Sequence, residues 1–292
     1  MRFCAYQYQN LPLPMLRERW QDAERRGFDA LWNVDTVVDP DLPGNTMFDG
    51  PATLVLMATA TERIRIGTLV SSLYFRQPVT LAKATVAVDH ISGGRVELAL
   101  GVGDPSAGDA AAGVSWPNAE RVARFAEFVE LTDLLLRQPA TTYSGSFYRC
   151  ARAESVPLAL QAPRPPITIA AHGPKMLSIA AEYADGWSSW GGYGVETARD
   201  FYSLTAGRSA AFDELCAGYG RNPLQIRHSV VCFPPLTPWE SVGYFTDMVG
   251  QLQAMGIDEL VLYWPETWRQ QPREWDVFDE VTSSVMPSLQ GG

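Results

Sequence analysis

A turn in the second half of the chain carries the residue types of an anion-binding site. The apolar run at 167–171 stops at His172, Gly173 and Pro174, and from Lys175 onward apolar residues recur at helical spacing. The first N–H groups of a helix have no intrahelical partner and lie at the positive end of the helix dipole. The pattern therefore predicts a site for an anionic group such as phosphate, with Lys175 as a counter-charge.

His172 is a second candidate for chemistry at this turn. The chain has three histidines, of which His90 ends a predicted helix and His228 lies inside a predicted strand. His172 alone among them follows a strand end beside the expected anion site. Its imidazole could contact a ligand or merely fill the turn, and the sequence leaves both interpretations open.

Tryptophans near the ends of predicted strands suggest a pocket for a flat, apolar ring system. The candidates are Trp32, Trp187, Trp190 and Trp264. Alternate residues of a strand point to opposite faces, so two of the four aromatic residues Trp187, Trp190, Tyr263 and Trp264 are expected in the core.

Asp35 ends an apolar stretch, where a carboxylate is costly to bury without a partner. It could cap a turn or face a pocket. Gly101 and Gly103 end another apolar stretch and invite comparison with a dinucleotide-binding fingerprint. Ser106 stands where the third glycine of that fingerprint belongs, so the glycines are better explained by a tight turn or a close backbone approach.

Other catalytic patterns are missing from the sequence. It contains no Ser-His-Asp spacing, no nucleophile elbow and no cluster of metal-ligating residues, and we expect no metal. The cysteines Cys4, Cys150, Cys216 and Cys232 are widely separated, which suggests neither a zinc site nor a disulfide framework.

The elements that would position these residues alternate along the chain. Short apolar runs predict strands at 2–8, 30–35, 64–70, 96–103, 167–171, 186–190, 225–233 and 259–264. Amphipathic segments predict helices at 14–26, 52–61, 79–90, 119–137, 175 onward, 196–217 and 239–255, with a last polar helix after them, and residues 142–150 resemble an inserted hairpin. Eight such units in one continuous domain, 1–292, predict an α/β fold of the TIM (β/α)8 barrel type, with an open doubly wound sheet as the alternative.

Composition and charge exclude several classes of function. The 292 residues are 46% hydrophobic and 19% charged, which is typical of a globular protein with a large core. The net charge of −10 argues against a nucleic-acid partner or an anionic membrane surface. The chain opens with no charged-then-apolar leader and has no apolar run of membrane-spanning length, so we expect a cytoplasmic protein.

Several stretches closely resemble the bacterial luciferase-like oxidoreductases. The signature-like segment is TERIRIGTLVSSLYFRQPVTLAKATVAVDHISGGRVELALGVG at 61–103, and it is followed in order by ERVARFAEFVELTDLLL, TYSGSFY, PRPPITIAAHGPKMLSIAAEYADGW and MGIDELVLYW. The resemblance covers most of the chain. It implies a TIM barrel and a cofactor that is either FMN or the deazaflavin coenzyme F420.

The resemblance also implies site residues. Matching cofactor positions are Asp35, Thr68, Leu69, Val70, Gly101, Gly103, Asp104, Ala170, Ala171, His172, Gly173, Pro174, Lys175 and Met176. Relatives have a non-prolyl cis peptide at the position of Leu69 and Val70. Catalytic candidates are Asp35, Thr36 and His172; in several deazaflavin enzymes a histidine stands where this chain has Thr36. Relatives also carry tryptophan and glutamate after strand four, where this chain has Asp104 to Asp109 with different chemistry.

The leading hypothesis is hydride transfer between coenzyme F420 and a small organic substrate. The alternative is an FMN-dependent monooxygenase that uses reduced FMN and oxygen. Two further classes stay open: a flavin-binding protein without turnover, and a barrel glycosidase, for which Asp104 and Glu266 would supply the two carboxylates. Relatives are commonly dimers, so a homodimer is expected.

Overall fold

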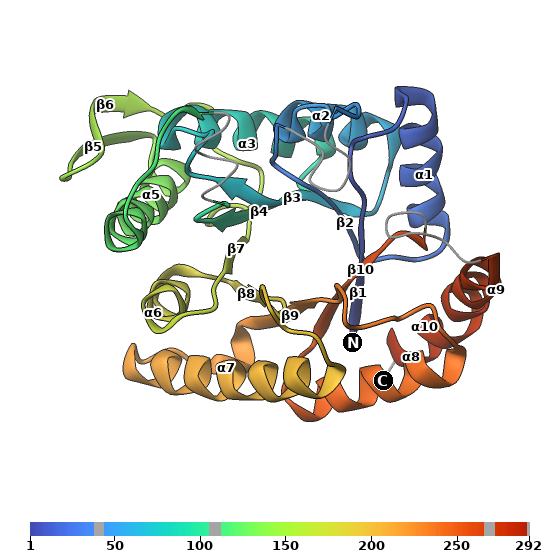
Figure 1. Cartoon of the computed structure of the whole chain (residues 1–292). Helices are drawn as coiled ribbons and strands as arrows, with labels where there is room; N and C mark the ends of the chain where they lie inside the picture. The colour runs from blue at the N-terminus through green and yellow to red at the C-terminus, as the bar shows by residue number, and fades with distance from the viewer. Residues whose placement is uncertain (38–43, 105–111, 266–271, 291–292) are drawn as a thin grey trace. The chain divides into compact units, whose positions relative to one another are not determined.

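Eight parallel strands close into a barrel in the order β1-β10-β9-β8-β7-β4-β3-β2. The computed structural model describes residues 1–37, 44–104, 112–265 and 272–290 (Figure 1). The barrel strands are β1 (Arg2–Tyr6), β2 (Ala30–Asn33), β3 (Arg65–Ser72), β4 (Val96–Gly101), β7 (Ile167–Ala170), β8 (Gly186–Ser189), β9 (Arg227–Val231) and β10 (Glu259–Tyr263). The predicted TIM barrel is confirmed, and closure of the sheet excludes the open doubly wound alternative.

Helices follow the strands largely where the periodicity predicts them. They are α1 (Leu13–Arg25), α2 (Gly50–Ala60), α3 (Pro78–Ser92), α5 (Asn118–Arg137), α6 (Pro174–Tyr183), α7 (Ala198–Gly218), α8 (Val242–Ala254), α9 (Pro272–Glu280) and α10 (Met286–Gln290), with a 3₁₀ turn at Pro223–Gln225 and a π-helical turn at Val281–Val285. The largest difference is at α8, predicted to begin at Trp239. Ser241 instead has extended backbone, and its hydroxyl caps the helix by accepting the N–H of Tyr244 at 3.1 Å.

Local sequence signals explain where helices near the candidate site begin and end. Asp49 caps α2, because its carboxylate accepts the N–H of Ala52 at 2.8 Å and Pro51 occupies the first turn. Gly93 ends α3 in the left-handed conformation, with φ of 67°, which a glycine adopts without steric cost.

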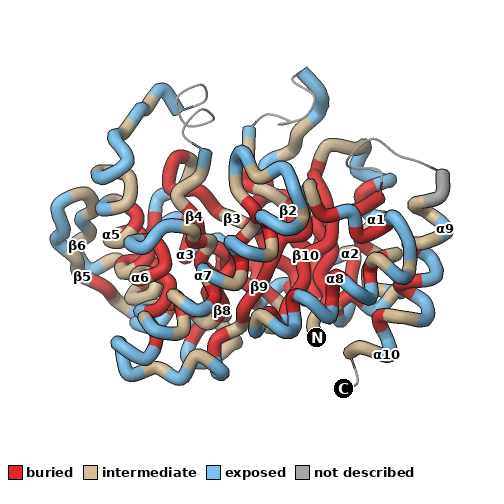
Figure 2. Tube along the Cα trace, turned by 60° about the horizontal axis from the view of Figure 1, so that its bottom comes forward, coloured by how far each residue is buried: buried red, intermediate tan, exposed pale blue. Residues whose placement is uncertain are grey.

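The chain divides into two compact units. The terminal unit comprises Met1–Gln7, Gln21–Trp32 and Ala171–Gly292, and the central unit comprises Tyr8–Trp20 and Asn33–Ala170. In each unit the barrel strands are buried and the helices expose their outer sides (Figure 2). Each unit therefore has a core of its own, made of strand residues covered by helices.

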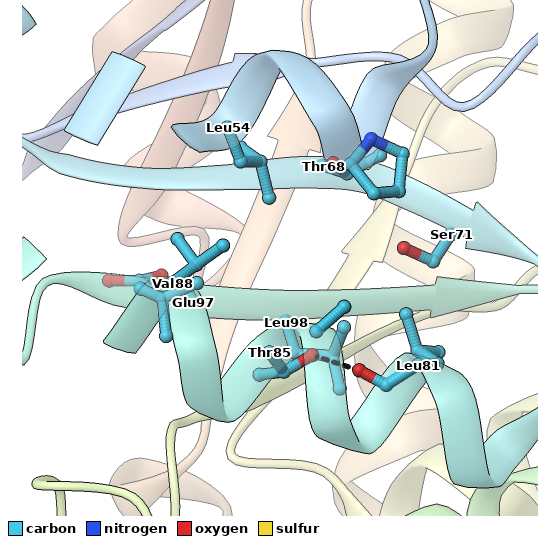
Figure 3. Close-up of a pocket in the computed structure, with 11 residues that line it drawn as sticks. Leu54, Thr68, Ser71, Leu81, Thr85, Val88, Glu97 and Leu98 are labelled. Carbon is cyan, nitrogen blue, oxygen red and sulfur yellow. Dashed lines mark hydrogen bonds between the residues drawn. The ribbon is translucent and has the colours of Figure 1, made fainter. Parts of the chain in front are cut away.

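In the central unit, α2 and α3 pack on β3 and β4. The layer between them contains a small cavity of about 20 Å³, lined by residues of all four elements that include Leu54, Thr68, Val88 and Leu98 (Figure 3). That volume is room for about one water molecule, so this cavity is a packing void rather than a ligand site.

The predicted hairpin is present in the central unit and lies beside α5 (Figure 1). It pairs β5 (Ala140–Ser144) with β6 (Arg149–Glu154) in antiparallel fashion. Glu127 of α5 fastens its turn, since the carboxylate accepts the N–H groups of Ser146, Phe147 and Tyr148 at 2.8–3.2 Å. The hairpin is thus held to the unit's outside and adds no strand to the barrel.

Buried ion pairs stand at the amino ends of the strands in both units. Glu259 on β10, 1% exposed, pairs with Arg2 of β1 and with Arg227 of β9. Glu97 of β4 pairs with Arg65 of β3 in the central unit. A carboxylate this buried needs its cation, because an unpaired buried charge is strongly destabilising. Among the residues described, no helix is long and apolar enough to cross a membrane.

Candidate functional site

In the central unit, Asp35 lies just beyond the end of β2 and makes an ion pair. Its side chain is 1% exposed, and Arg76 reaches it from the segment that follows β3. Arg76 donates Nε to Oδ2 at 2.9 Å and Nη2 to Oδ1 at 2.5 Å. The N–H of Ser72 also donates to Oδ2, at 3.2 Å. Asp35 is therefore an internal anchor, a role different from the cap or open pocket residue that the sequence suggested. Thr36 beside it is partly buried.

The ends of β3 and β4 lie too close together for side chains at two glycine positions. A Cβ on Gly101 would come within 2.4 Å of Val70 Cγ2, and one on Gly103 within 2.1 Å of Ser72 Oγ. Gly103 also has a φ of 74°. Gly103 turns in the left-handed region, as the tight-turn interpretation expected, and the nearest atoms that approach both glycines belong to side chains of β3. An approach of these glycines to a ligand stays a prediction. The Leu69–Val70 peptide is cis, as the resemblance implied.

Thr68 has a different environment from its neighbours on β3. Its hydroxyl donates to Oδ1 of Asn33 at 2.7 Å, and its side chain lines the cavity beneath α2 and α3 (Figure 3). This side of the strand faces the helices, so the predicted contact between Thr68 and a cofactor finds no support in its placement. Asp104, beyond the end of β4, is exposed. Residues 105–109 and Glu266 lie outside the described residues.

In the terminal unit, the predicted anion turn leads into α6 as expected. Ala171 continues the strand pattern, with its N–H bonded to the Ser188 carbonyl at 3.0 Å. Gly173 is the N-cap residue of α6, and no side chain caps the helix. Gly173, Pro174 and Lys175 are exposed, while Met176 is one of the buried residues of α6. The open first turn can therefore offer backbone N–H groups to an anion.

His172 is neutral and fixed to the next strand end. Its Nε2 accepts the backbone N–H of Trp190 at 3.3 Å, which places the ring proton on Nδ1. Burial, and secondarily the charge of Arg208, lowers the pKa of His172 to about 4. At neutral pH the residue can donate a hydrogen bond through Nδ1 but carries no positive charge.

Arg208 of α7 holds the same segment from the other direction. Its Nη1 donates to the carbonyls of Trp190 at 2.6 Å and Gly191 at 3.3 Å, and to the Ser189 hydroxyl at 3.2 Å. The Trp190 ring lies 5.7 Å from His172 and 5.2 Å from Tyr193, a residue that is 84% exposed. Trp190 is thus a partly exposed aromatic surface whose backbone is fixed on both sides.

The other candidate tryptophans are buried. Trp187 stacks on Phe212 of α7, with 5.2 Å between ring centroids, and its Nε1 donates to the Ala171 carbonyl. Trp264 packs at 4.9 Å against Phe278 of α9. These contacts place both rings on the helix side. Tyr263 is buried as well, so three of the four strand-end aromatics belong to the core, and the expectation of two was wrong. Trp32 is also fully buried.

Comparison with known protein families identifies the family of this chain. Residues 2–231 match the luciferase-like monooxygenase family. The chain belongs to that family. The match spans β1 to β9 and includes both groups of candidate residues.

Individual relatives of this luciferase-like protein carry names that mention coenzyme F420 or a pterin substrate. An F420-dependent hydroxymycolic acid dehydrogenase of Mycobacterium tuberculosis is 31% identical over 205 residues, which are 70% of this chain and 54% of that protein. A 5,10-methylenetetrahydromethanopterin reductase of Methanolobus tindarius is 32% identical over 164 residues, 56% of this chain and 46% of that one. The matched part of the chain thus spans about half the length of these curated relatives.

A solved structure agrees on the fold. An F420-dependent secondary alcohol dehydrogenase, in complex with an F420-acetone adduct, superposes with a TM-score of 0.81 over 96% of this chain and 97% of that one. Sequence identity is 16%, so this likeness speaks for the luciferase-like barrel alone.

Four cations of this luciferase-like chain, Lys83, Lys175, Arg76 and Arg164, were candidates to meet an anionic cofactor, and three of them make other contacts. Arg76 pairs with Asp35 and Asp49, and Arg164, 2% exposed, pairs with Asp133. The exposed Lys83 donates to a backbone carbonyl at 3.3 Å. Lys175 has no ion-pair partner among the described residues, and it stands in the first turn of α6. No group of His, Cys, Asp or Glu suited to a metal ion occurs within the described ranges.

Sequence reasoning considered Arg76 only as a cation that could meet an anionic cofactor, and it missed Arg208. Arg76 lies between the end of β3 and the start of α3. This position close to a strand end is the sequence feature that could have indicated a role at the site. Arg208 lies in the middle of a helix, where an arginine reads as an ordinary solvent-facing residue. Its role depends on the fold of the loop after β8, which no local pattern indicates.

Proposed function

We propose that this protein is an oxidoreductase that transfers a hydride between coenzyme F420 and a small organic substrate. The main support comes from curated relatives that are 31–32% identical to this chain. One is named as an F420-dependent dehydrogenase and the other as a reductase, and the chain belongs to the luciferase-like monooxygenase family. When bound, the coenzyme would supply the hydride-transfer chemistry itself. The protein would bind the coenzyme, orient it towards the substrate and shield both from water.

The donor set at the start of α6 fits a phosphate group. The first-turn N–H groups, the Nδ1–H of the neutral His172 and the ammonium of Lys175 are all donors, and no side chain caps the helix in competition with them. A neutral imidazole contributes a hydrogen bond, whereas Lys175 contributes charge. This arrangement supports a role in holding the phosphate that coenzyme F420 and FMN both carry.

Each strand end has a separate role under this proposal. Trp190, held by His172 and Arg208, offers an aromatic surface for a flat ring or an apolar substrate. Leu69, Val70 and Gly101 form the closely packed edge of β3 and β4 that the family resemblance associates with the cofactor ring. His172 is suited to binding, and we assign it no proton transfer.

A charge reversal at Gly173 tests the phosphate site. A Cβ at this position meets nothing within 4 Å and φ is −88°, so Gly173→Asp fits the fold and supplies a favourable N-cap. We expect the aspartate to weaken binding of coenzyme F420 at least tenfold, because it places a negative charge where the phosphate binds. Gly173→Asn is the matched control with the same shape and no charge.

The measurement is a fluorescence titration of wild type and both variants with coenzyme F420, FMN and riboflavin, which lacks the phosphate. Riboflavin binding should not distinguish the aspartate from the asparagine variant. Equal affinity of both variants for the phosphorylated ligands would place the phosphate elsewhere. Tight binding of FMN with no binding of coenzyme F420 would favour the alternative of a reduced-FMN monooxygenase, which the family's description supports.

A further inference from the structure

Both oxygens of the Asp35 carboxylate accept hydrogen bonds from the protein. Three groups donate to it: Nε and Nη2 of Arg76 and the N–H of Ser72. Each contact requires its oxygen to act as an acceptor. Protonation of Asp35 would remove the negative charge that strengthens these hydrogen bonds to the guanidinium.

Arg76 is held as firmly as Asp35. It donates to Asp49 as well, and Asp49 caps α2 through its other oxygen. Burial alone would lower the pKa of Arg76, but the hydrogen bonds and charges of Asp35 and then Asp49 raise it overall. The guanidinium therefore joins three elements: the end of β2, the segment after β3 and the start of α2.

Further hydrogen bonds hold the end of β2 in place. Asn33 donates Nδ2 to the Gly50 carbonyl and to the Thr53 hydroxyl, both at 2.7 Å. Gln9 donates to the carbonyls of Val34 and Phe48 at 2.6 and 2.9 Å. The end of β2 is thus tied to α2 through Asn33, and two contacts tie it to β3: Asn33 accepts from Thr68, and Asp35 accepts from Ser72.

We propose that Asp35 and Arg76 act as one positioning unit that fixes the ends of β2 and β3, and that Asp35 does not donate a proton in the reaction. A ligand at these strand ends meets Arg76 in place of an acid. Its Nη1 has no hydrogen-bond partner within the described chain and is a donor that does not titrate near neutral pH. The three charged groups, Asp35, Arg76 and Asp49, sum to a single negative charge, which disfavours an anionic ligand group there and favours a neutral oxygen acceptor.

Hydrogen exchange tests the positioning role without reference to turnover. Arg76→Lys keeps the charge but cannot reproduce the two-nitrogen contact with Asp35. We expect the Ser72 amide of the otherwise folded variant to exchange at least tenfold faster than in wild type, and the same in Asp35→Asn. Arg137→Lys, the same change at an exposed ion pair with Asp133 in the same unit, should leave that amide unchanged. Unaltered protection of Ser72 in Arg76→Lys would overturn the positioning role.

The kinetic measurement rests on the proposed function and tests the proton-transfer claim. With coenzyme F420, Asp35→Asn and Arg76→Lys should lower kcat/KM by similar factors and leave the pH profile unchanged in shape. The double variant should lose little more than either single one, since the two residues act as a unit. A pH limb lost in Asp35→Asn but kept in Arg76→Lys would identify Asp35 as the proton donor and refute the proposal. If wild type neither binds nor uses coenzyme F420, the proposed function fails, and the exchange data still decide the positioning role.

Discussion

The stability of the protein should depend on pH through His172. In the folded chain its pKa is lowered to about 4, first by burial and second by the charge of Arg208. In the unfolded chain a histidine titrates near pH ~6.5. Protonation in the folded state would also remove the acceptor that Nε2 offers to the Trp190 N–H. The perturbation we consider is therefore acidification, compared between wild type and a variant without this imidazole.

The sign follows from proton binding in the two states. Between about pH 6.5 and about pH 4 the unfolded state binds more protons at this residue than the folded state does, so stability rises with pH across that window and is lost as pH falls. The full shift corresponds to roughly 3.4 kcal/mol at about 1.4 kcal/mol per unit. His172 is partly solvated, so we expect about 2 kcal/mol to be lost by about pH 4.5.

Urea unfolding at about pH 7 and about pH 4.5 measures this loss. Wild type should lose about 2 kcal/mol more than His172→Gln between the two conditions, because glutamine does not titrate. Parallel losses in wild type and His172→Gln would refute the assignment of a buried, neutral imidazole at this turn.

Three further outcomes follow from packing. Gly103→Ala should cost about 1–3 kcal/mol by combining positive φ with the clash against Ser72, whereas Gly113→Ala, at φ 63° in open space, should cost less; both are measured by urea unfolding. Trp187→Ala should cost about 3–5 kcal/mol as a core truncation and lower the melting temperature sharply. Because α2 contains no charged residue and exposes Leu56, we expect a homodimer that Leu56→Glu converts to a folded monomer, as checked by analytical ultracentrifugation.

The fold was predictable from the sequence because its signals are local and repeated. Each strand is a short apolar run and each helix has its own periodicity, so an error of a few residues at one boundary leaves the order of elements intact. The α8 start shows the limit of this reasoning. Trp239 fits the apolar pattern of the helix that follows, but it packs in the core and donates Nε1 to the Tyr263 carbonyl. The helix begins only after its N-cap residue, Ser241.

The turn at His172 was predictable for the same reason, since a strand end, a glycine and a helix start are adjacent in sequence. The state of its imidazole was not. It depends on Trp190 and Arg208, which are brought to it by the pairing of β8 with its neighbours and by α7. Likewise, which tryptophans face helices depends on the side of the strand that α7 and α9 cover.

Asp35 shows most clearly why residue type and position do not give a role. An acidic residue after a buried strand predicts a functional carboxylate, and Arg76, 41 residues later, turns that carboxylate into an internal anchor. Net charge misleads in the same way. A chain of net charge −10 can still receive an anion, because backbone N–H groups and a neutral imidazole contribute donors that the charge total does not count. Arg76 and Arg164 are meanwhile paired with carboxylates inside the fold. What a ligand meets at the strand ends is decided by which charges remain unpaired, and that is a property of tertiary contacts rather than of composition.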